Sequence, residues 1–166
     1  MLERHDTVGA TWERERWDSF RLVTENQLCA LPDWPCTAIG QEPHGFMPKA
    51  EVVRYLAEFA KTHALPVRLR TGVRRVTRAW DGWNVQLEPT KDEGSEGGAG
   101  GAGGGWLRCR QVVLAIGGFH VPKTPPWHAQ LPASVTQLQS RDYKNPRQLP
   151  PGDVVVVGSA QSGTQT

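Results

Sequence analysis

The feature that most constrains this chain is an apolar run that leads directly into a glycine-spaced turn. Residues 153–157 (DVVVV) are followed by residues 158–163 (GSAQSG). A nearly continuous apolar run is typical of a strand covered on both faces, and such a strand followed by this glycine spacing is typical of a dinucleotide-binding βαβ unit. There Gly158 allows the tight turn and Gly163 allows close packing of the next helix. Ala160 replaces the middle glycine, which the pyrophosphate approaches.

The start of the chain indicates a second nucleotide-binding unit. Residues 1–3 (MLE) predict the end of a strand that finishes on a carboxylate. In dinucleotide-binding folds a carboxylate ends the second strand, about 20 residues after the first glycine, and accepts hydrogen bonds from ribose hydroxyls. Glu3 fits this position, and a solvated charge near a terminus is the alternative. We expect the strand and glycine loop that normally precede such a carboxylate to be missing.

The middle of the chain predicts one helix and an antiparallel excursion, after an irregular segment at 4–47. Pro48 suits the start of a helix, where its missing N–H removes no hydrogen bond. Apolar residues at helical spacing then predict a helix over residues 49–63. A short strand is expected at residues 65–69. Asp81-Gly82 predicts a hairpin turn, and the flanking patterns predict strands at 73–80, 83–88 and 106–110.

Two further segments complete the predicted fold. The glycine-rich tract at 94–105 has little to bury, so we expect a flexible hairpin insertion rather than a phosphate-binding loop. Residues 111–116 form a second nearly continuous apolar run and end in Gly117-Gly118. We therefore predict an α/β fold. Residues 1–150 would form a partial Rossmann-type domain with a three-strand antiparallel excursion, and residues 151–166 the first strand and glycine turn of a second Rossmann-type unit.

Charge and cysteine content argue against several classes of protein. The 166 residues carry a formal net charge of +2 and no basic block, so we expect no nucleic-acid partner. No apolar run approaches the roughly 20 residues that span a bilayer, and the charged N-terminus does not resemble a signal peptide. Cys29, Cys36 and Cys109 have no metal or redox spacing. We expect reduced thiols, no metal site and a cytoplasmic location.

An ordered series of motifs resembles the flavin-containing monooxygenases and related two-dinucleotide flavoproteins. The series is LER at 2–4, VGATW at 8–12, RWDSFRL at 16–22, FMPK at 46–49, VRRV at 73–76, DGW at 81–83, VVLAIGG at 112–118 and YKNP at 143–146, followed by the second glycine turn. The match covers nearly the whole chain except the glycine-rich tract. The order of the motifs is more specific than any one of them, and the chain resembles an internal piece of such an enzyme.

The resemblance implies cofactor-binding residues and no catalytic side chain. Those assigned to FAD are Glu3 at the adenosine ribose, Gly9 and Trp12 in the family's Gly-x-x-Trp position near the flavin and pyrophosphate, Val73 beside the adenine, and Ala115 and Gly117 in a close-approach turn. Gly158 and Gly163 would cradle the nicotinamide dinucleotide. A plain core aromatic is the alternative for Trp12.

The sequence departs from the family pattern at two places. Gln139 stands where the family has a histidine, and glutamine can form hydrogen bonds but cannot titrate near neutrality. Ala115-Ile116-Gly117 replaces the family's Ala-Thr-Gly and so lacks a hydroxyl. A charged role at the histidine position is therefore not expected for Gln139.

The function that the resemblance implies is an FAD-dependent, NADPH-using monooxygenase that acts on a small molecule and oxygen through a peroxyflavin. The flavin supplies such chemistry, and the protein binds and orients it. A related flavin-dependent reductase or oxidase is one alternative. A non-catalytic remnant or truncated gene product that binds no cofactor is another. We expect the chain by itself to be inactive and not to hold FAD, because backbone contacts of a first glycine loop to the pyrophosphate are missing.

Overall fold

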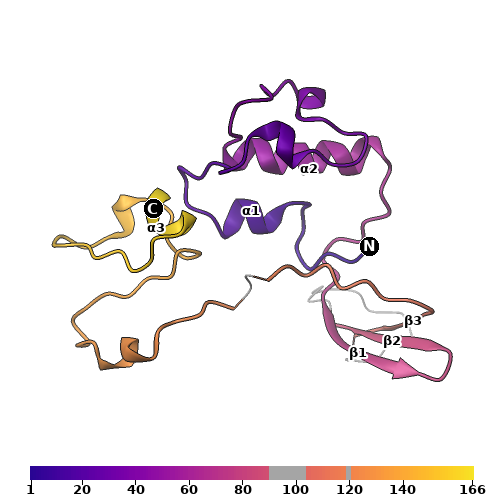
Figure 1. Ribbon diagram of the computed structural model, residues 1–166. Coiled ribbons are helices and arrows are strands. Elements are labelled where there is room, and N and C mark those ends of the chain that lie inside the picture. Colours follow the sequence, from indigo (N-terminus) through magenta and orange to yellow (C-terminus); the bar gives the residue numbers. More distant parts are fainter. Residues whose placement is uncertain (90–103, 119–120) are drawn as a thin grey trace, which may run out of the picture. The chain divides into compact units, whose positions relative to one another are not determined.

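The computed structural model describes residues 1–89, 104–118 and 121–166. Internal contacts divide the chain into two compact units (Figure 1). Unit 1 comprises Met1–Val8 and Ala64–Gly117, and unit 2 comprises Gly9–His63 and Gly118–Thr166. The expected flexible insertion at 94–105 lies, except for its last two residues, outside the described ranges. The expected domain boundary at residue 150 stays a prediction.

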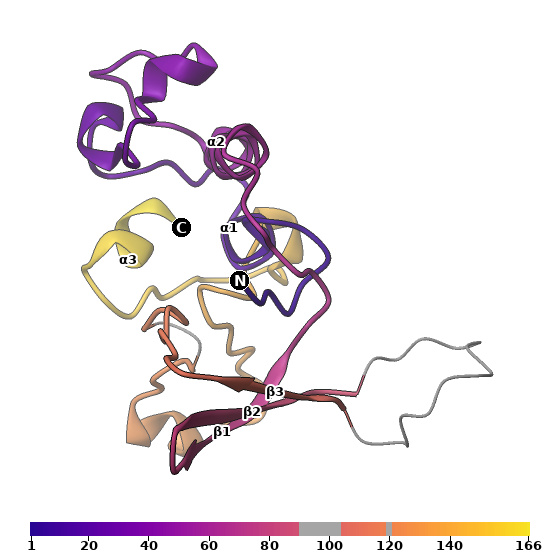
Figure 2. The ribbon, with the colours of Figure 1, turned by 90° about the vertical axis from the view of Figure 1, so that its right-hand side faces the viewer.

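Unit 1 contains the antiparallel excursion that the sequence predicts. Its strands are β1 (Val73–Ala79), β2 (Gly82–Leu87) and β3 (Trp106–Cys109), in the order β1-β2-β3 (Figure 2). Ala79 pairs with Gly82, so the turn residues are Trp80 and Asp81, one position earlier than predicted. The φ of 156° at Gly82 suits the glycine that closes this turn.

One face of this sheet is apolar because side chains alternate along each strand. Val76 pairs with Val85, which pairs in turn with Leu107. Val85 is only 6% exposed and Leu87 only 9%. On the same face, two residues further along each strand, the Arg78 guanidinium carbon lies 5.1 Å from the ring centroid of its cross-strand partner Trp83. The burial of alternate β2 side chains explains why this register holds.

The N-terminal residues of unit 1 lie beside the chain that precedes β1. Leu2 forms a parallel bridge with Arg68, and the Glu3 amide donates to the Arg68 carbonyl at 3.0 Å. The Thr71 amide donates to the Glu3 carbonyl at 2.8 Å. The short strand predicted at 65–69 is therefore reduced to a single bridge.

Unit 2 is organised around α2 (Lys49–Thr62), which begins and ends close to the predicted bounds. Its buried face presents Val52 and Tyr55 to a core that also contains Cys36, Ile39 and Met47. The short helix α1 (Ala10–Arg14) lies beside α2 in both views (Figure 1 and Figure 2). The segment predicted to be irregular, 4–47, thus contains α1, together with two 3₁₀ helices at Asn26–Cys29 and Cys36–Ile39.

A buried amide orders the segment between α1 and α2. Asn26 is 1% exposed. Its Oδ1 accepts from the Met47 amide at 2.8 Å, and its Nδ2 donates to the Glu42 carbonyl at 2.7 Å. Because buried polar groups are costly unless paired, these bonds fix the path of the loop.

The two apolar runs at 111–116 and 153–157 are not paired strands, and this part of the prediction is wrong for the structure described. No strand pairing includes either run in the described residues. Val113 and Val155 are mostly exposed. A β-strand requires a neighbouring strand to satisfy its backbone N–H and C=O groups, and no described segment supplies one. The rest of the C-terminal part forms short helices at Pro126–Gln130 and Pro146–Gln148, and α3 (Gln161–Gln165).

Candidate functional site

The start of α1 depends on Gly9, the first residue of the family-like Gly-x-x-Trp motif. Gly9 is the N-cap of α1 and has a left-handed φ of 81°. A Cβ at this position would lie 3.5 Å from the Val53 Cα and 3.5 Å from the Leu56 Cδ1. The backbone there is thus close to α2, and its conformation favours glycine. Trp12, one helical turn after Gly9, packs against the core that includes Val52 and Tyr55 of α2.

Trp12 belongs to an aromatic group rather than standing alone. Its ring centroid lies 5.5 Å from that of Phe20, which lies 5.1 Å from Trp17. The Arg16 guanidinium lies over both Trp12 and Phe20, at 5.1 Å and 5.8 Å from their centroids. Such cation–π contacts hold a guanidinium near an apolar surface.

Trp12 forms one wall of an apolar pocket in unit 2. The pocket has a volume of about 320 Å³ and is lined by Trp12, Phe20, Leu22, Val23, Thr24, Cys29, Leu31, Met47, Val52, Tyr55, Leu56 and Gln161. This volume is at the lower end of the range of about 300–1,000 Å³ for small-molecule sites. The Tyr55 hydroxyl accepts from the Leu31 amide at 2.9 Å and donates to the Trp34 carbonyl. Because its hydroxyl is bound to these backbone groups, Tyr55 contributes its aromatic ring to the pocket lining.

The second glycine turn is closely packed. Gly158 has a φ of 125°. A Cβ on Gly163 would overlap the Gly158 carbonyl oxygen, so no side chain is tolerated there. The Gly163 amide donates to the Ala160 carbonyl at 2.9 Å. The backbone of this turn thus approaches the first turn of α3 closely, and the roles of Gly158 and Gly163 at a nicotinamide dinucleotide stay predictions.

The turn and the pocket are joined by Gln161, the first residue of α3. Its Nε2 donates to the Arg21 carbonyl at 3.3 Å, and its side chain lines the pocket. The pocket thus receives Trp12 from the Gly-x-x-Trp helix and Gln161 from the second glycine turn. Gly9, Trp12, Gly158 and Gly163 all belong to unit 2.

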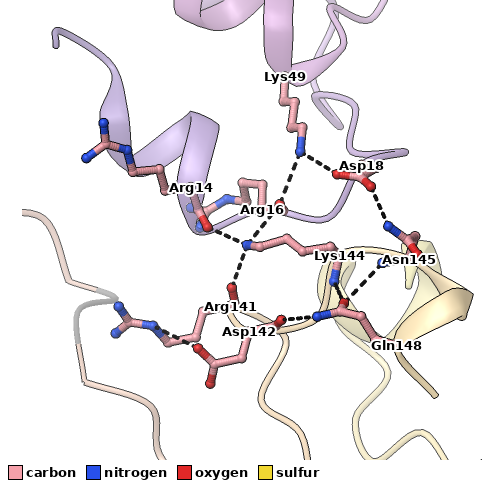
Figure 3. Close-up of polar contacts among 9 residues, drawn as sticks. All are labelled: Arg14, Arg16, Asp18, Lys49, Arg141, Asp142, Lys144, Asn145 and Gln148. Atoms are coloured by element: carbon pink, nitrogen blue, oxygen red, sulfur yellow. Dashed lines mark hydrogen bonds and ion pairs between the residues drawn. The ribbon is translucent and has the colours of Figure 1, made fainter. Parts of the chain in front are cut away.

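A polar cluster ties residues 14–18 to residues 141–148 within unit 2 (Figure 3). The Lys144 ammonium donates to the carbonyls of Arg14, Arg141 (2.9 Å) and Arg16 (3.4 Å). The Asp18 amide donates to the Lys144 carbonyl at 2.8 Å. We call this group the Lys144 cluster.

Asp18 is the acidic centre of the Lys144 cluster. One oxygen accepts from Lys49 Nζ at 2.8 Å and the other from Asn145 Nδ2 at 2.7 Å. These hydrogen bonds, that from Lys49 first, hold the pKa of the Asp18 carboxyl below its ordinary value. Burial, and then the nearby Lys49 charge, lower the pKa of the Lys144 amine. The Asp18 carboxylate thus lies beside the Lys49 ammonium and near that of Lys144, and Asp142 and Glu15 are also close to Lys144.

The remaining residues implied by the resemblance belong to unit 1. The Glu3 Oε1 accepts from the His5 amide at 2.8 Å. Val73 opens β1 opposite Leu87. Ala115 is exposed, and Gly117 has a left-handed φ of 73°. The structure therefore groups Glu3, Val73, Ala115 and Gly117 in one unit, and their roles at FAD stay predictions.

Several residues of the site have no distinguishing signal in the sequence. They are Leu22, Cys29, Tyr55, Gln161 and Lys144 in its hydrogen-bonding role. The sequence indicated only their regions: Leu22 lies in RWDSFRL at 16–22, Gln161 in the second glycine turn and Lys144 in YKNP. The apolar face of α2, which includes Val52 and Leu56, indicated the core.

Neither a metal centre nor a membrane span is found in the part of the chain that the structure describes. There, no group of three or more His, Cys, Asp or Glu side chains could hold a metal ion. No helix within those residues is both long and apolar enough to cross a bilayer.

The chain belongs to the pyridine nucleotide-disulphide oxidoreductase family, which matches residues 1–166. A curated relative, the "Uncharacterized oxidoreductase CzcO" of Bacillus subtilis (strain 168), is 33% identical over 165 residues. That alignment covers 99% of this chain and 42% of the relative. The chain thus spans less than half the length of this relative.

Further similarity points to flavin monooxygenases. The indole-3-pyruvate monooxygenase YUCCA1 of Oryza sativa subsp. japonica is 25% identical over 167 residues, which are 99% of this chain and 37% of that protein. The solved structure of a double mutant of the flavin monooxygenase from Stenotrophomonas maltophilia matches with a TM-score of 0.79 and 26% identity. It covers 98% of this chain and 44% of that one. The predicted Rossmann-type flavoprotein fold is confirmed, and the chain is flavin-monooxygenase-like.

Proposed function

We propose that this chain supplies cofactor-contacting and pocket-forming parts of an FAD-dependent, NADPH-using monooxygenase that acts on a small molecule and oxygen. The observation that carries the proposal is the shared pocket. Trp12, from the helix that the family places near the flavin, and Gln161, from the glycine turn that the family places at the nicotinamide dinucleotide, line the same space. A site that joins the two cofactors suits transfer of reducing equivalents between them.

The residues present fit both cofactors. Gly9 has a left-handed φ that strains any other residue, in the position that the family places near the flavin and pyrophosphate. Gly163 has no room for a side chain, as the close helix packing of a dinucleotide-binding turn requires. Glu3, Val73, Ala115 and Gly117 are the further proposed contacts for FAD. When bound, FAD would accept electrons from NADPH and deliver them to oxygen. The chain itself would orient the rings with Trp12 and Gln161 and exclude water with its apolar wall.

The relatives support this reaction class, since their names include indole-3-pyruvate monooxygenase and flavin monooxygenase. The three free cysteines agree with our proposal of a cytoplasmic location. A flavin-dependent reductase or oxidase uses the same cofactor-binding parts, so it is the second candidate. It differs in that NADPH would be consumed without oxygen transfer to substrate.

A chimera tests the proposal. Residues 1–166 replace the aligned segment of the Stenotrophomonas enzyme, and flavin content, NADPH oxidation and oxygenated product are measured. We expect bound flavin and NADPH oxidation coupled to oxygen transfer. Gly163→Val should abolish NADPH oxidation while flavin stays bound, because its side chain has no room beside Gly158. A folded chimera that takes up no flavin would contradict the proposal and favour a non-catalytic remnant, whereas NADPH oxidation without product would favour a reductase or oxidase.

A further inference from the structure

Helix α1 is too short to be stable by itself, so its position depends on contacts with other parts of unit 2. It has five residues, and isolated helices shorter than about 12 residues are marginal in water. Its start is fixed at Gly9, whose backbone lies against α2. The last carbonyls of a helix have no partner within the helix, so the other end of α1 needs a donor from elsewhere in the chain.

Lys144 supplies this donor across 130 positions of sequence (Figure 3). Its ammonium donates to the carbonyl of Arg14, the last residue of α1, and to those of Arg16 at 3.4 Å and Arg141 at 2.9 Å. An ammonium has three N–H groups, and these three carbonyls use all of them. Lys144 therefore has no donor left for a ligand, and it acts on the backbone that it holds.

A second link joins the same two segments. The Arg141 Nη2 donates to the Glu15 Oε1 at 2.8 Å, and the two side chains are 33% and 18% exposed. Glu15 is the C-cap residue of α1. Both links thus tie the end of α1 to residues 141–144, which precede the second glycine turn in the same unit.

Trp12 lies between the two fixed ends of α1. Its amide donates to the Gly9 carbonyl at 2.9 Å. The Arg16 guanidinium covers its ring at 5.1 Å from the centroid, and Lys144 holds the carbonyl of the same arginine. The place of the Trp12 ring in the pocket therefore depends on Gly9 before it and on Lys144 after it.

We infer that Lys144 is a positioning residue: from the segment that leads into the second glycine turn it caps the end of α1, and so holds Trp12 at the pocket that Gln161 also lines. The inference rests on the proposed function in that this pocket receives the cofactor rings. Without the ammonium of Lys144 both cofactors still bind, but the wall that orients their rings is displaced.

Fluorine NMR of the 166-residue chain, labelled with 5-fluorotryptophan, tests the positioning without flavin or NADPH. The Trp12 signal is identified by its loss in Trp12→Phe. Lys144→Met should shift or broaden this signal, because the end of α1 loses its donor, and should leave the signals of Trp80, Trp83 and Trp106 in unit 1 where they are. An unchanged Trp12 signal in folded Lys144→Met would overturn the inference.

Two controls separate this role from a general loss of stability or of charge. Gly40→Ala strains a left-handed φ of 75° in unit 2, at a position where the added Cβ meets nothing within 4 Å. Lys123→Met removes a charge at an exposed position. Neither change should move the Trp12 signal, and a shift in either control equal to that in Lys144→Met would overturn the inference.

A second variant covers the case in which Lys144→Met does not fold. Arg141→Met removes the ion pair with Glu15 at the same end of α1 and should also shift the Trp12 signal. If Lys144→Met is unfolded and Arg141→Met leaves the signal in place, the inference is wrong.

The chimera described above tests the consequence for the reaction. There Lys144→Met should lower the rate of anaerobic flavin reduction at saturating NADPH by about tenfold or more, because small displacements of reacting groups slow a reaction strongly. The NADPH concentration that gives half the maximal rate should change by less than about threefold. An unchanged rate of reduction would refute the positioning role. A chimera that takes up no flavin is a failure of the proposed function, and the Trp12 signal of the chain alone then decides the inference.

Discussion

Strand β2 and the run at 153–157 differ in how their partners are supplied. Both sequences are apolar enough to predict a strand, yet only β2 is paired. Both partners of β2 are its neighbours along the chain: β1 precedes it through the turn at Trp80-Asp81, and β3 is the next strand after it. The run at 153–157 is predicted to be a strand of a parallel sheet. A parallel strand pairs with a segment that is distant in sequence, because a crossover connection must join the two. Apolar character thus predicts the tendency to form a strand, and the available partner decides whether it forms.

Aspartate substitutions in the two regions give the largest expected contrast. Val85→Asp would bury a carboxylate in the sheet, where the wild-type side chain is 6% exposed, and should lower the free energy of unfolding of unit 1 by about 3 kcal/mol or more. Val155→Asp, at a residue of unit 2 that is 84% exposed, should change the free energy of unfolding of unit 2 by less than about 0.5 kcal/mol. Urea unfolding measures both changes, with amide hydrogen exchange in β1 and β2 as the readout for unit 1 and in α2 as the readout for unit 2.

A comparable loss of stability from Val155→Asp would contradict this contrast, because it would show that residues 153–157 are packed in solution. Exchange protection of amides at 111–116 or 153–157 in the wild type would lead to the same conclusion. We expect those amides to exchange quickly, since they make no strand ladder in the described residues.

The Lys144 cluster gives a second test of the C-terminal region, because it anchors the segment that precedes the unpaired run at 153–157. Lys144→Met removes the donor to three carbonyls and should destabilise unit 2 by about 1 kcal/mol, after discounting for solvent screening. Thermal unfolding measures this effect. Lys123→Met, at an exposed position, is the matched control and should be neutral. Equal effects of the two changes would mean that the cluster contributes no stability.

The smallest expected effect is on the acid dependence of stability. The pKa of Asp18 is lowered in the folded protein by hydrogen bonds from Lys49 and Asn145. Its contribution is present above the ordinary aspartate pKa of about 3.9 and is lost as the pH falls through the lower folded value. Asp18→Asn should therefore flatten the fall in melting temperature below that pH. The control Asp153→Asn, at an exposed site, should leave the fall in melting temperature with acid unchanged. If Asp18→Asn and Asp153→Asn gave the same dependence of melting temperature on pH, Asp18 would not be the group responsible.

Local patterns account for the elements that the sequence predicts well. Pro48 and the apolar spacing after it predict a helix at 49–63, and α2 occupies Lys49–Thr62. The alternating residues about Asp81 predict the hairpin. Both signals come from neighbours in sequence, so no distant contact is needed to interpret them.

The pocket and the Lys144 cluster could not be predicted in the same way. Thr24, Cys29 and Gln161 meet only because loops and a distant turn converge in unit 2. The acceptors of Lys144 are main-chain carbonyls, which every residue carries, so no side-chain pattern indicates them. Helix α1 has five residues, too few for a periodic pattern.

The tight packing at Gly163 has a genetic consequence. Every amino-acid change that one nucleotide substitution can produce in a glycine codon adds a side chain. At this position even the smallest one would collide with the Gly158 carbonyl oxygen. A library of single-nucleotide variants should therefore contain no missense allele at codon 163 that preserves the turn, whereas codon 118, where an added Cβ meets nothing within 4 Å, should tolerate several.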